Sequence, residues 1–217
     1  MLTKSEAIVL HTLKYGESRL IIDLFTREHG RLSCIMTRGK GARSRGPLLQ
    51  PLSLLDMELD VRPRVQLQQV RNVRMLQPYG SLPFEPAKTA VVMFLSEFLY
   101  HALRGEQQPD EQLFDYMKHS FLWLDTAQER YANFHLVFLM HLSRFLGYDP
   151  QHHDFQKAED AACMQTLMGL DFDNMHELRM KHQERNRYLD ILLAYYHQHL
   201  PSFPELKSLD VLQELFA

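Results

Sequence analysis

A glycine-rich run of positive charge, TRGKGARSRG at residues 37–46, has the clearest chemical potential in this sequence. Its cations are Arg38, Lys40, Arg43 and Arg45, and no acid interrupts them. Arginine guanidinium groups match the geometry of phosphate oxygens, and glycine lets a backbone approach an anion closely. The run therefore predicts a phosphate-binding surface, with a solvated hairpin tip as the alternative.

The run is not a nucleotide-binding phosphate loop, because no Ser or Thr follows its Gly-Lys pair as GxxxxGK[ST] requires. The sequence also lacks GxSxG, HExxH and Cys-His signatures. We therefore predict no catalytic residues, no cofactor and no enzymatic activity.

Twelve histidines and two cysteines raise the question of a metal. His197 and His199 point about 200° apart on a helix and cannot share one ion. The remaining cluster is His152 and His153, with Cys163 nearby, but structural zinc sites are usually rich in cysteine. The sequence predicts no metal, with a site at His152, His153 and Cys163 as the alternative.

Charge divides the chain into two parts. Residues 1–80 carry 13 Lys and Arg against 7 acids, whereas residues 81–217 carry 11 against 20. This split predicts a basic domain over 1–80 and an acidic domain over 81–217 with different partners. We expect the basic domain to bind DNA through Arg19, Arg38, Lys40, Arg43, Arg45, Arg71 and Arg74.

The first 77 residues predict five short strands. The clearest is SLLDMELDV, in which Leu55, Met57, Leu59 and Val61 alternate with acids, as in a half-buried antiparallel strand. A fifth strand follows, with a bulge expected between Leu67 and Val70. Five strands with a loop after the third suit an antiparallel OB-type barrel.

From Pro83 the apolar period becomes helical. The expected helices cover a segment ended by Gly105, one opened by Asp110, one ended by Gly147, and three more over about 159–168, 185–199 and 208–216. The fold class is therefore α+β, with a barrel followed by an all-helical domain. The chain shows no signal peptide and no apolar span, so we expect it to be cytoplasmic and associated with the nucleoid.

Three aromatic residues of the basic domain could stack on bases, namely Tyr15, Phe25 and Tyr79. Phe25 lies in an apolar strand, which predicts a core position. With so few stacking candidates, we expect the contact with nucleic acid to be mostly electrostatic.

Three segments resemble the RecO family of bacterial recombination mediators: AIVLHTLKYGESRLIIDLFTREHGRLSCIMTRGKGAR, LLQPLSLLDMEL and FHLVFLMHLSRFLGYDP. Many members carry zinc-binding cysteines after the last segment, but QHHDFQ stands there in this chain, so zinc is not implied. The resemblance implies binding of single- and double-stranded DNA, annealing of complementary strands, cooperation with RecR, and help in loading RecA. The alternative is a protein adaptor whose basic loop docks an acidic partner.

The resemblance also implies that the helical domain holds the acidic, Phe-ended tail of single-strand-binding protein. Such a tail needs an apolar slot and a cation for its terminal carboxylate. Arg130 and Arg144 flank the apolar helix at 134–145 and are our first candidates, followed by Lys118.

Overall fold

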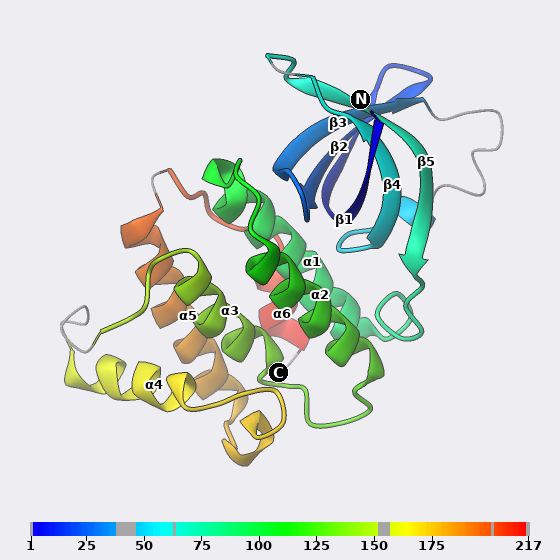
Figure 1. The fold of residues 1–217 in the computed structure, drawn as a ribbon. Coiled ribbons are helices and arrows are strands. Elements are labelled where there is room, and N and C mark those ends of the chain that lie inside the picture. Colours follow the sequence, from blue (N-terminus) through cyan, green and yellow to red (C-terminus); the bar gives the residue numbers. More distant parts are fainter. Residues whose placement is uncertain (1, 38–46, 63, 152–156, 201, 216–217) are drawn as a thin grey trace.

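A computed structural model shows a closed barrel followed by a group of helices (Figure 1). The structure describes residues 2–37, 47–62, 64–151, 157–200 and 202–215. Six residues singled out in the sequence lie outside this described part: Arg38, Lys40, Arg43, Arg45, His152 and His153.

The barrel confirms the predicted five strands: β1 (Leu2–Tyr15), β2 (Arg19–Thr26), β3 (Gly30–Thr37), β4 (Leu54–Asp60) and β5 (Leu67–Gln77). They close in the order β1-β2-β3-β5-β4. Every neighbouring pair is antiparallel except β3 and β5, which run parallel. Closure leaves no open sheet edge, which is how small barrels avoid edge-to-edge association.

The barrel interior follows from the alternation of each strand. Leu55, Met57 and Leu59 are buried as predicted, and the acids between them lie on the outer side. The interior cluster is completed by Ala7, Val9, Leu20, Ile22, Leu24, Cys34, Met36, Leu49 and Val70. Burial in this cluster raises the pKa of the Cys34 thiol to about 12, so it stays protonated near neutral pH.

The bulge in β5 lies further along the strand than predicted. Leu59 faces Val70 and Asp60 faces Gln69 in regular register, whereas the pairing shifts between Asp56 and Glu58. The extra residue is accommodated near Asn72, which has a positive φ of 50°. Asn tolerates this left-handed conformation better than most residues, so the backbone places the irregularity there.

The helical part confirms the predicted change of period. It comprises α1 (Pro86–Ala102), α2 (Glu111–Thr126), α3 (Phe134–Phe145), α4 (Ala158–Met168), α5 (His182–His199) and α6 (Leu209–Leu215). Asp110 caps α2 by accepting a hydrogen bond of 2.9 Å from the Leu113 amide, as its residue type suggests. No helix among the described residues combines the length and apolar character needed to span a bilayer.

The core of the helical part extends onto the outer face of the barrel, whereas the barrel interior forms a separate cluster. Ile8, Leu10 and Phe25 point outward from the barrel and join the cluster built by the helices. The Phe25 and Phe114 rings stack with centroids 6.5 Å apart, and the Ser96 hydroxyl donates to the Leu10 carbonyl at 2.6 Å. Helices α1 and α2 therefore lie against the barrel, and the other helices extend away from it (Figure 1).

The segment between β5 and α1 is fixed by a partly buried polar node. The Asp125 carboxylate accepts hydrogen bonds from the backbone amides of Gly80, Ser81 and Leu82, and these bonds hold its pKa below the usual value although burial opposes them. The buried Lys88 ammonium donates to the Ala127 carbonyl at 2.5 Å. The node ties the connection between the two parts of the chain to the end of α2.

Candidate nucleic-acid interface

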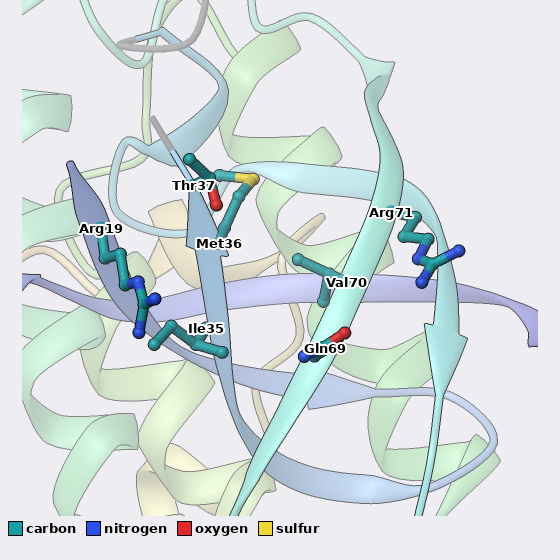
Figure 2. Close-up of a pocket in the computed structure, with 7 residues that line it drawn as sticks. All are labelled: Arg19, Ile35, Met36, Thr37, Gln69, Val70 and Arg71. Carbon is teal, nitrogen blue, oxygen red and sulfur yellow. The ribbon is translucent and has the colours of Figure 1, made fainter. Parts of the chain in front are cut away.

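A hollow opens in the barrel wall where β3 and β5 separate. Their parallel pairing extends only from Ser33 and Leu67 to Ile35 and Gln69. Beyond this point the strands diverge and leave a hollow of about 310 Å³ (Figure 2). It is lined by Arg19, Ile35, Met36, Thr37, Gln69, Val70 and Arg71.

Two of the predicted DNA-binding arginines flank this hollow. Arg19 begins β2 and Arg71 lies on β5, and Figure 2 shows their side chains on opposite sides of the opening. Both are exposed. Within the described part of the chain, neither pairs with a carboxylate closer than 4.0 Å, so both remain available to an anion.

Arg74 is the third predicted DNA-binding arginine among the described residues, and it differs because a carboxylate already pairs with it. Arg74 lies opposite Asp56 on β4 and donates to it from Nε at 2.8 Å. Arg62 is similarly engaged by Asp60 at 2.8 Å, and this hydrogen bond holds the pKa of Asp60 below its usual value. A carboxylate partner competes with phosphate, so Arg74 has less to offer DNA than Arg19 or Arg71.

The predicted cationic run continues directly from the hollow along the sequence. Thr37, a lining residue and the last residue of β3, immediately precedes Arg38. The four cations of the run lie outside the described residues. Their role in DNA binding therefore stays a prediction from the sequence.

The three aromatic candidates fall into different environments. Phe25 is fully buried, which confirms its predicted place in the core. Tyr79 packs against the core and donates its hydroxyl to the Leu52 carbonyl at 2.8 Å. Tyr15 is 52% exposed and is the one of the three that could reach a base.

A second hollow, of about 510 Å³, lies in the helical part. It combines apolar side chains, Leu178 and Met180, with the exposed cations Arg130, Arg179 and Lys181. Its other lining residues are Ala132, Asn133, His176, Glu184 and Arg185. This mixture of apolar surface and positive charge suits a ligand with an aromatic group and a carboxylate.

Internal hydrogen bonds shape this hollow. The Asn133 amide donates to the carbonyls of Met175 and Leu178 at 3.0 and 2.8 Å. Arg185 donates from Nε to Asn133 Oδ1 at 3.1 Å and from Nη2 to the Met180 carbonyl at 3.2 Å. Partial burial lowers the Arg185 pKa. Arg185 therefore positions the walls, whereas Arg179 and Lys181 face outward.

The structure brings only one of the three predicted tail-binding cations to this hollow. Arg130 lines it, with Nη1 3.4 Å from His176 Nε2. Arg144 donates to Asp149 at 3.1 Å and is not a lining residue. Lys118 forms an ion pair of 2.7 Å with Glu6 of β1, where α2 meets the barrel.

Sequence reasoning missed Arg179 and Lys181. Both belong to LRMKH at residues 178–182, between the 3-10 turn at Met175–Glu177 and α5. The available signal was a pair of cations alternating with apolar residues in an otherwise acidic domain. The sequence could not show that they line the same hollow as Arg130, because they lie about 50 residues from it along the chain.

A metal site finds no support in the part of the chain that the structure describes, where no group of three or more His, Cys, Asp or Glu side chains is arranged to hold an ion. Cys163 is half-buried on α4. Since His152 and His153 lie outside the described residues, the alternative with these ligands is untested.

Comparison with known proteins identifies the class. The family model described as "Recombination protein O N terminal" matches residues 1–79, and "Recombination protein O C terminal" matches residues 83–154. Proteins named DNA repair protein RecO from Phocaeicola vulgatus and Bacteroides fragilis are each 41% identical, in alignments of 242 positions that cover both chains completely. The protein of that name from Christiangramia forsetii is 32% identical over 241 residues, again covering both chains.

The fold and the exposed arginines define a two-part protein with a cationic barrel joined to a helical domain. Both halves match the corresponding family models, and the relatives match along the full length. The chain belongs to the RecO family, which confirms the resemblance seen in the sequence.

Proposed function

We propose that this protein is a DNA-repair mediator that binds single- and double-stranded DNA through the phosphates. Arg19 and Arg71 form the described part of the binding surface, the cations at 38–45 extend it, and Arg74 contributes less. The observation that carries the proposal is the pair of exposed arginines on either side of the barrel hollow, which no carboxylate of the described residues neutralises. Its relatives are named DNA repair proteins.

Strand annealing requires no bond chemistry on this proposal. Two complementary strands repel each other because each phosphate carries a negative charge. A cationic surface replaces the condensed counterions and lowers this repulsion, which allows the complementary bases to pair. Catalytic groups are unnecessary, so we infer a mediator rather than an enzyme.

Two sets of variants test the DNA surface. One is Arg19→Ala with Arg71→Ala, and the other replaces all four loop cations with Ala. When the logarithm of single-strand affinity is plotted against the logarithm of salt concentration, removing one phosphate contact should make the slope shallower by about 0.7. Arg62→Ala is the matched control, because Asp60 already neutralises that exposed arginine.

A salt series in a filter-binding assay measures these slopes. If the parent protein bound DNA without salt dependence, or if both variants kept the parent slope, the proposal of a phosphate-binding surface would be contradicted. The protein adaptor would then become the better description, since its basic loop needs an acidic protein and no DNA.

We infer that the helical hollow receives the acidic tail of single-strand-binding protein. Leu178 and Met180 offer an apolar surface for an aromatic ring, and Arg130, Arg179 and Lys181 offer cations for carboxylates. Arg144 and Lys118 are already paired with acids, so we rank them behind these three. RecR and RecA enter the proposal through family membership, as the partner and the recombinase to be loaded.

A labelled tail peptide tests this site. Arg130→Ala and Arg179→Ala should each weaken binding roughly tenfold or more, as expected when a charge-assisted hydrogen bond is removed. Arg144→Ala serves as the control, since it removes an exposed cation outside the hollow. Equal reductions in all three variants would indicate a general charge effect and contradict the assignment to this hollow. DNA binding by the same variants should stay at the parent level.

A further inference from the structure

An apolar row crosses the outer face of the barrel beside the hollow. Leu13 faces Ile21 across β1 and β2, and Ile21 faces Ile35 across β2 and β3. Successive side chains on a strand point to opposite faces. Their neighbours in sequence are buried inside the barrel, namely Leu20, Ile22, Cys34 and Met36. Leu13, Ile21 and Ile35 therefore point outward, and Leu13 is 52% exposed.

The adjacent row adds an aromatic ring and a cation. Tyr15 faces Arg19 across β1 and β2, and Arg19 faces Thr37 across β2 and β3. Residues two apart on one strand lie on the same face, so Tyr15 lies beside Leu13 and Arg19 beside Ile21. Tyr15 is 52% exposed. We call the set of Leu13, Tyr15, Ile21 and Ile35 the outer platform.

The hollow extends this platform toward a second cation. Ile35 belongs to both the platform and the lining of the hollow, and its partner across the parallel seam is Gln69. Arg71 stands beyond the hollow, on the side opposite Arg19 (Figure 2). The apolar strip from Leu13 to Ile35 thus has Arg19 beside it on β2 and Arg71 beyond its β3 end, and neither arginine forms an ion pair among the described residues.

Three acids lie near this strip, and none forms an ion pair with Arg19 or Arg71 among the described residues. Glu58 faces Arg71 across β4 and β5 but accepts a hydrogen bond of 2.8 Å from the Asn72 amide. Asp23 lies two residues after Ile21 on β2 and faces Ser33 of β3. It is buried and accepts a hydrogen bond of 2.5 Å from the Ser33 hydroxyl. Glu17, in the β1–β2 turn, is exposed and forms no ion pair with Arg19, both residues lying in the described part of the chain. A ligand for the strip must therefore offer flat apolar surface together with separated negative charges.

Single-stranded DNA has this chemistry, and duplex DNA does not. Unpaired bases expose flat faces that stack on aromatic and apolar side chains, whereas the bases of a duplex are already stacked on one another. We propose that the outer platform binds the bases of single-stranded DNA, with Tyr15 stacked on one base, Arg19 holding a phosphate next to it and Arg71 holding a phosphate further along the strand, beyond the hollow. This inference rests on the proposed DNA-binding function and adds a defined stacking surface to a contact that the sequence predicted to be mostly electrostatic.

The proposal gives the barrel a preference for single strands. Arginine contacts to phosphate are available to both forms of DNA, but the platform is useful only to unpaired bases. Part of the single-strand affinity should therefore persist when salt screens the phosphate contacts. Stacking is tolerant of base identity, so no sequence preference is implied.

The first experiment uses the unaltered protein. Its affinity is measured for an oligothymidylate, for a chain of the same length in which abasic sites replace the bases, and for a duplex of that length. We expect the intact single strand to bind at least about fivefold more tightly than the abasic chain, the lower end of what one stacked base contributes. Equal affinities for the intact and abasic chains would overturn the proposal.

The second experiment changes the ring and leaves every charge in place. Tyr15→Ala should weaken single-strand binding about fivefold to a hundredfold. Its salt slope should equal the parent slope, because every phosphate contact remains. Tyr15→Phe retains a stacking ring and should restore binding. The matched control is Phe84→Ala, which removes a 77% exposed aromatic residue from the segment between β5 and α1.

The outcomes separate this proposal from the one on which it rests. A Tyr15→Ala variant that bound single strands as the parent does, or weakened single-strand and duplex binding equally, would show that the platform does not hold bases. The salt-dependent phosphate contacts would be unaffected by that result. A parent protein with no salt-dependent DNA binding would instead contradict the proposed function. Since Tyr15 is half exposed, circular dichroism should confirm that the variant folds normally.

Discussion

Individual ionisable side chains in this protein differ chiefly in whether an ion-pair partner or burial already determines their charge. Arg74 is neutralised by Asp56, whereas Arg19 and Arg71 find no such carboxylate in the described part of the chain. Lys88 and His135 lie at the other extreme, because both are buried in the helical part. Lys88 is compensated by carbonyl oxygens and by Glu85 at 3.5 Å. Burial of His135 instead favours its neutral ring.

His135 should make stability dependent on pH. Burial, with a smaller contribution from Arg185, lowers its pKa from 6.5 to about 3. Between these values the unfolded chain holds one proton more than the folded chain, so the free energy of unfolding decreases as pH falls below 6.5. The slope for one proton is at most about 1.4 kcal/mol per pH unit.

Urea unfolding at pH 7 and pH 5 measures this effect. The decrease in stability between the two conditions should be smaller by about 2 kcal/mol in His135→Gln than in the parent protein. His119→Gln is the control, since His119 is exposed on α2. Identical decreases in the parent and His135→Gln would show that His135 does not carry the dependence.

Among the elements, the β2–β3 turn lies close against the segment between α1 and α2. Gly30 has a φ of 63°, and a Cβ at this position would lie 2.3 Å from the Gln108 carbonyl oxygen. The next residue, Arg31, donates its amide to the Glu106 carbonyl at 2.8 Å and its guanidinium to the Tyr100 carbonyl at 2.6 Å. The β2–β3 turn thus also provides the contact with the segment between α1 and α2.

Gly30→Ala should destabilise the protein more than a turn substitution usually does. A positive φ costs a non-glycine residue about 1–3 kcal/mol, and the forced displacement of the 106–108 segment adds a similar amount. Gly16→Ala is a matched control, because Gly16 has a φ of 67° but no atom within 4 Å of a Cβ. Denaturant unfolding should show a destabilisation about twice as large for Gly30→Ala. Equal destabilisation by the two substitutions would mean that the close approach to Gln108 is unimportant.

At the scale of the whole molecule, the barrel is inseparable from the helices that cover it. Ile8, Leu10 and Phe25 are buried only because α1 and α2 pack on them. The two parts differ in charge and in proposed partners, yet the helical core includes side chains from both of them. The predicted division into two domains between residues 80 and 81 falls after the end of β5 and before the start of α1. It therefore stays a proposal about function.

A shared core predicts a single unfolding transition. The protein has one tryptophan, Trp123 on α2, whose fluorescence reports the helical part. Phe25→Ala, a change in the barrel, should destabilise the protein by about 3–5 kcal/mol and shift the Trp123 transition by the same amount. Circular dichroism should follow the same curve. Two separate unfolding transitions, with the Trp123 transition unaffected by Phe25→Ala, would show that the barrel and the helices unfold independently and would contradict this prediction.

The sequence by itself determined the order and type of the elements. Alternation marked β4, helical spacing marked α1 to α3, and Asp110 marked the start of α2, because these signals depend on neighbours within one or two turns. Local apolar character also placed Phe25 in the core. The separation of charge between the two parts could likewise be counted directly from the residues.

Only the tertiary structure decided which charges are available and which side chains share a surface. The pairing of Arg74 with Asp56 depends on barrel register, and that of Lys118 with Glu6 joins residues 112 positions apart. Barrel closure likewise determines the parallel β3–β5 seam, its hollow and the row from Leu13 to Ile35. Arg130, shortly before α3, lines the same hollow as Arg179 and Lys181, shortly before α5, because these two helices pack together. Local periodicity carries no information about contacts between distant segments, which are set by how the strands and helices bury their apolar faces.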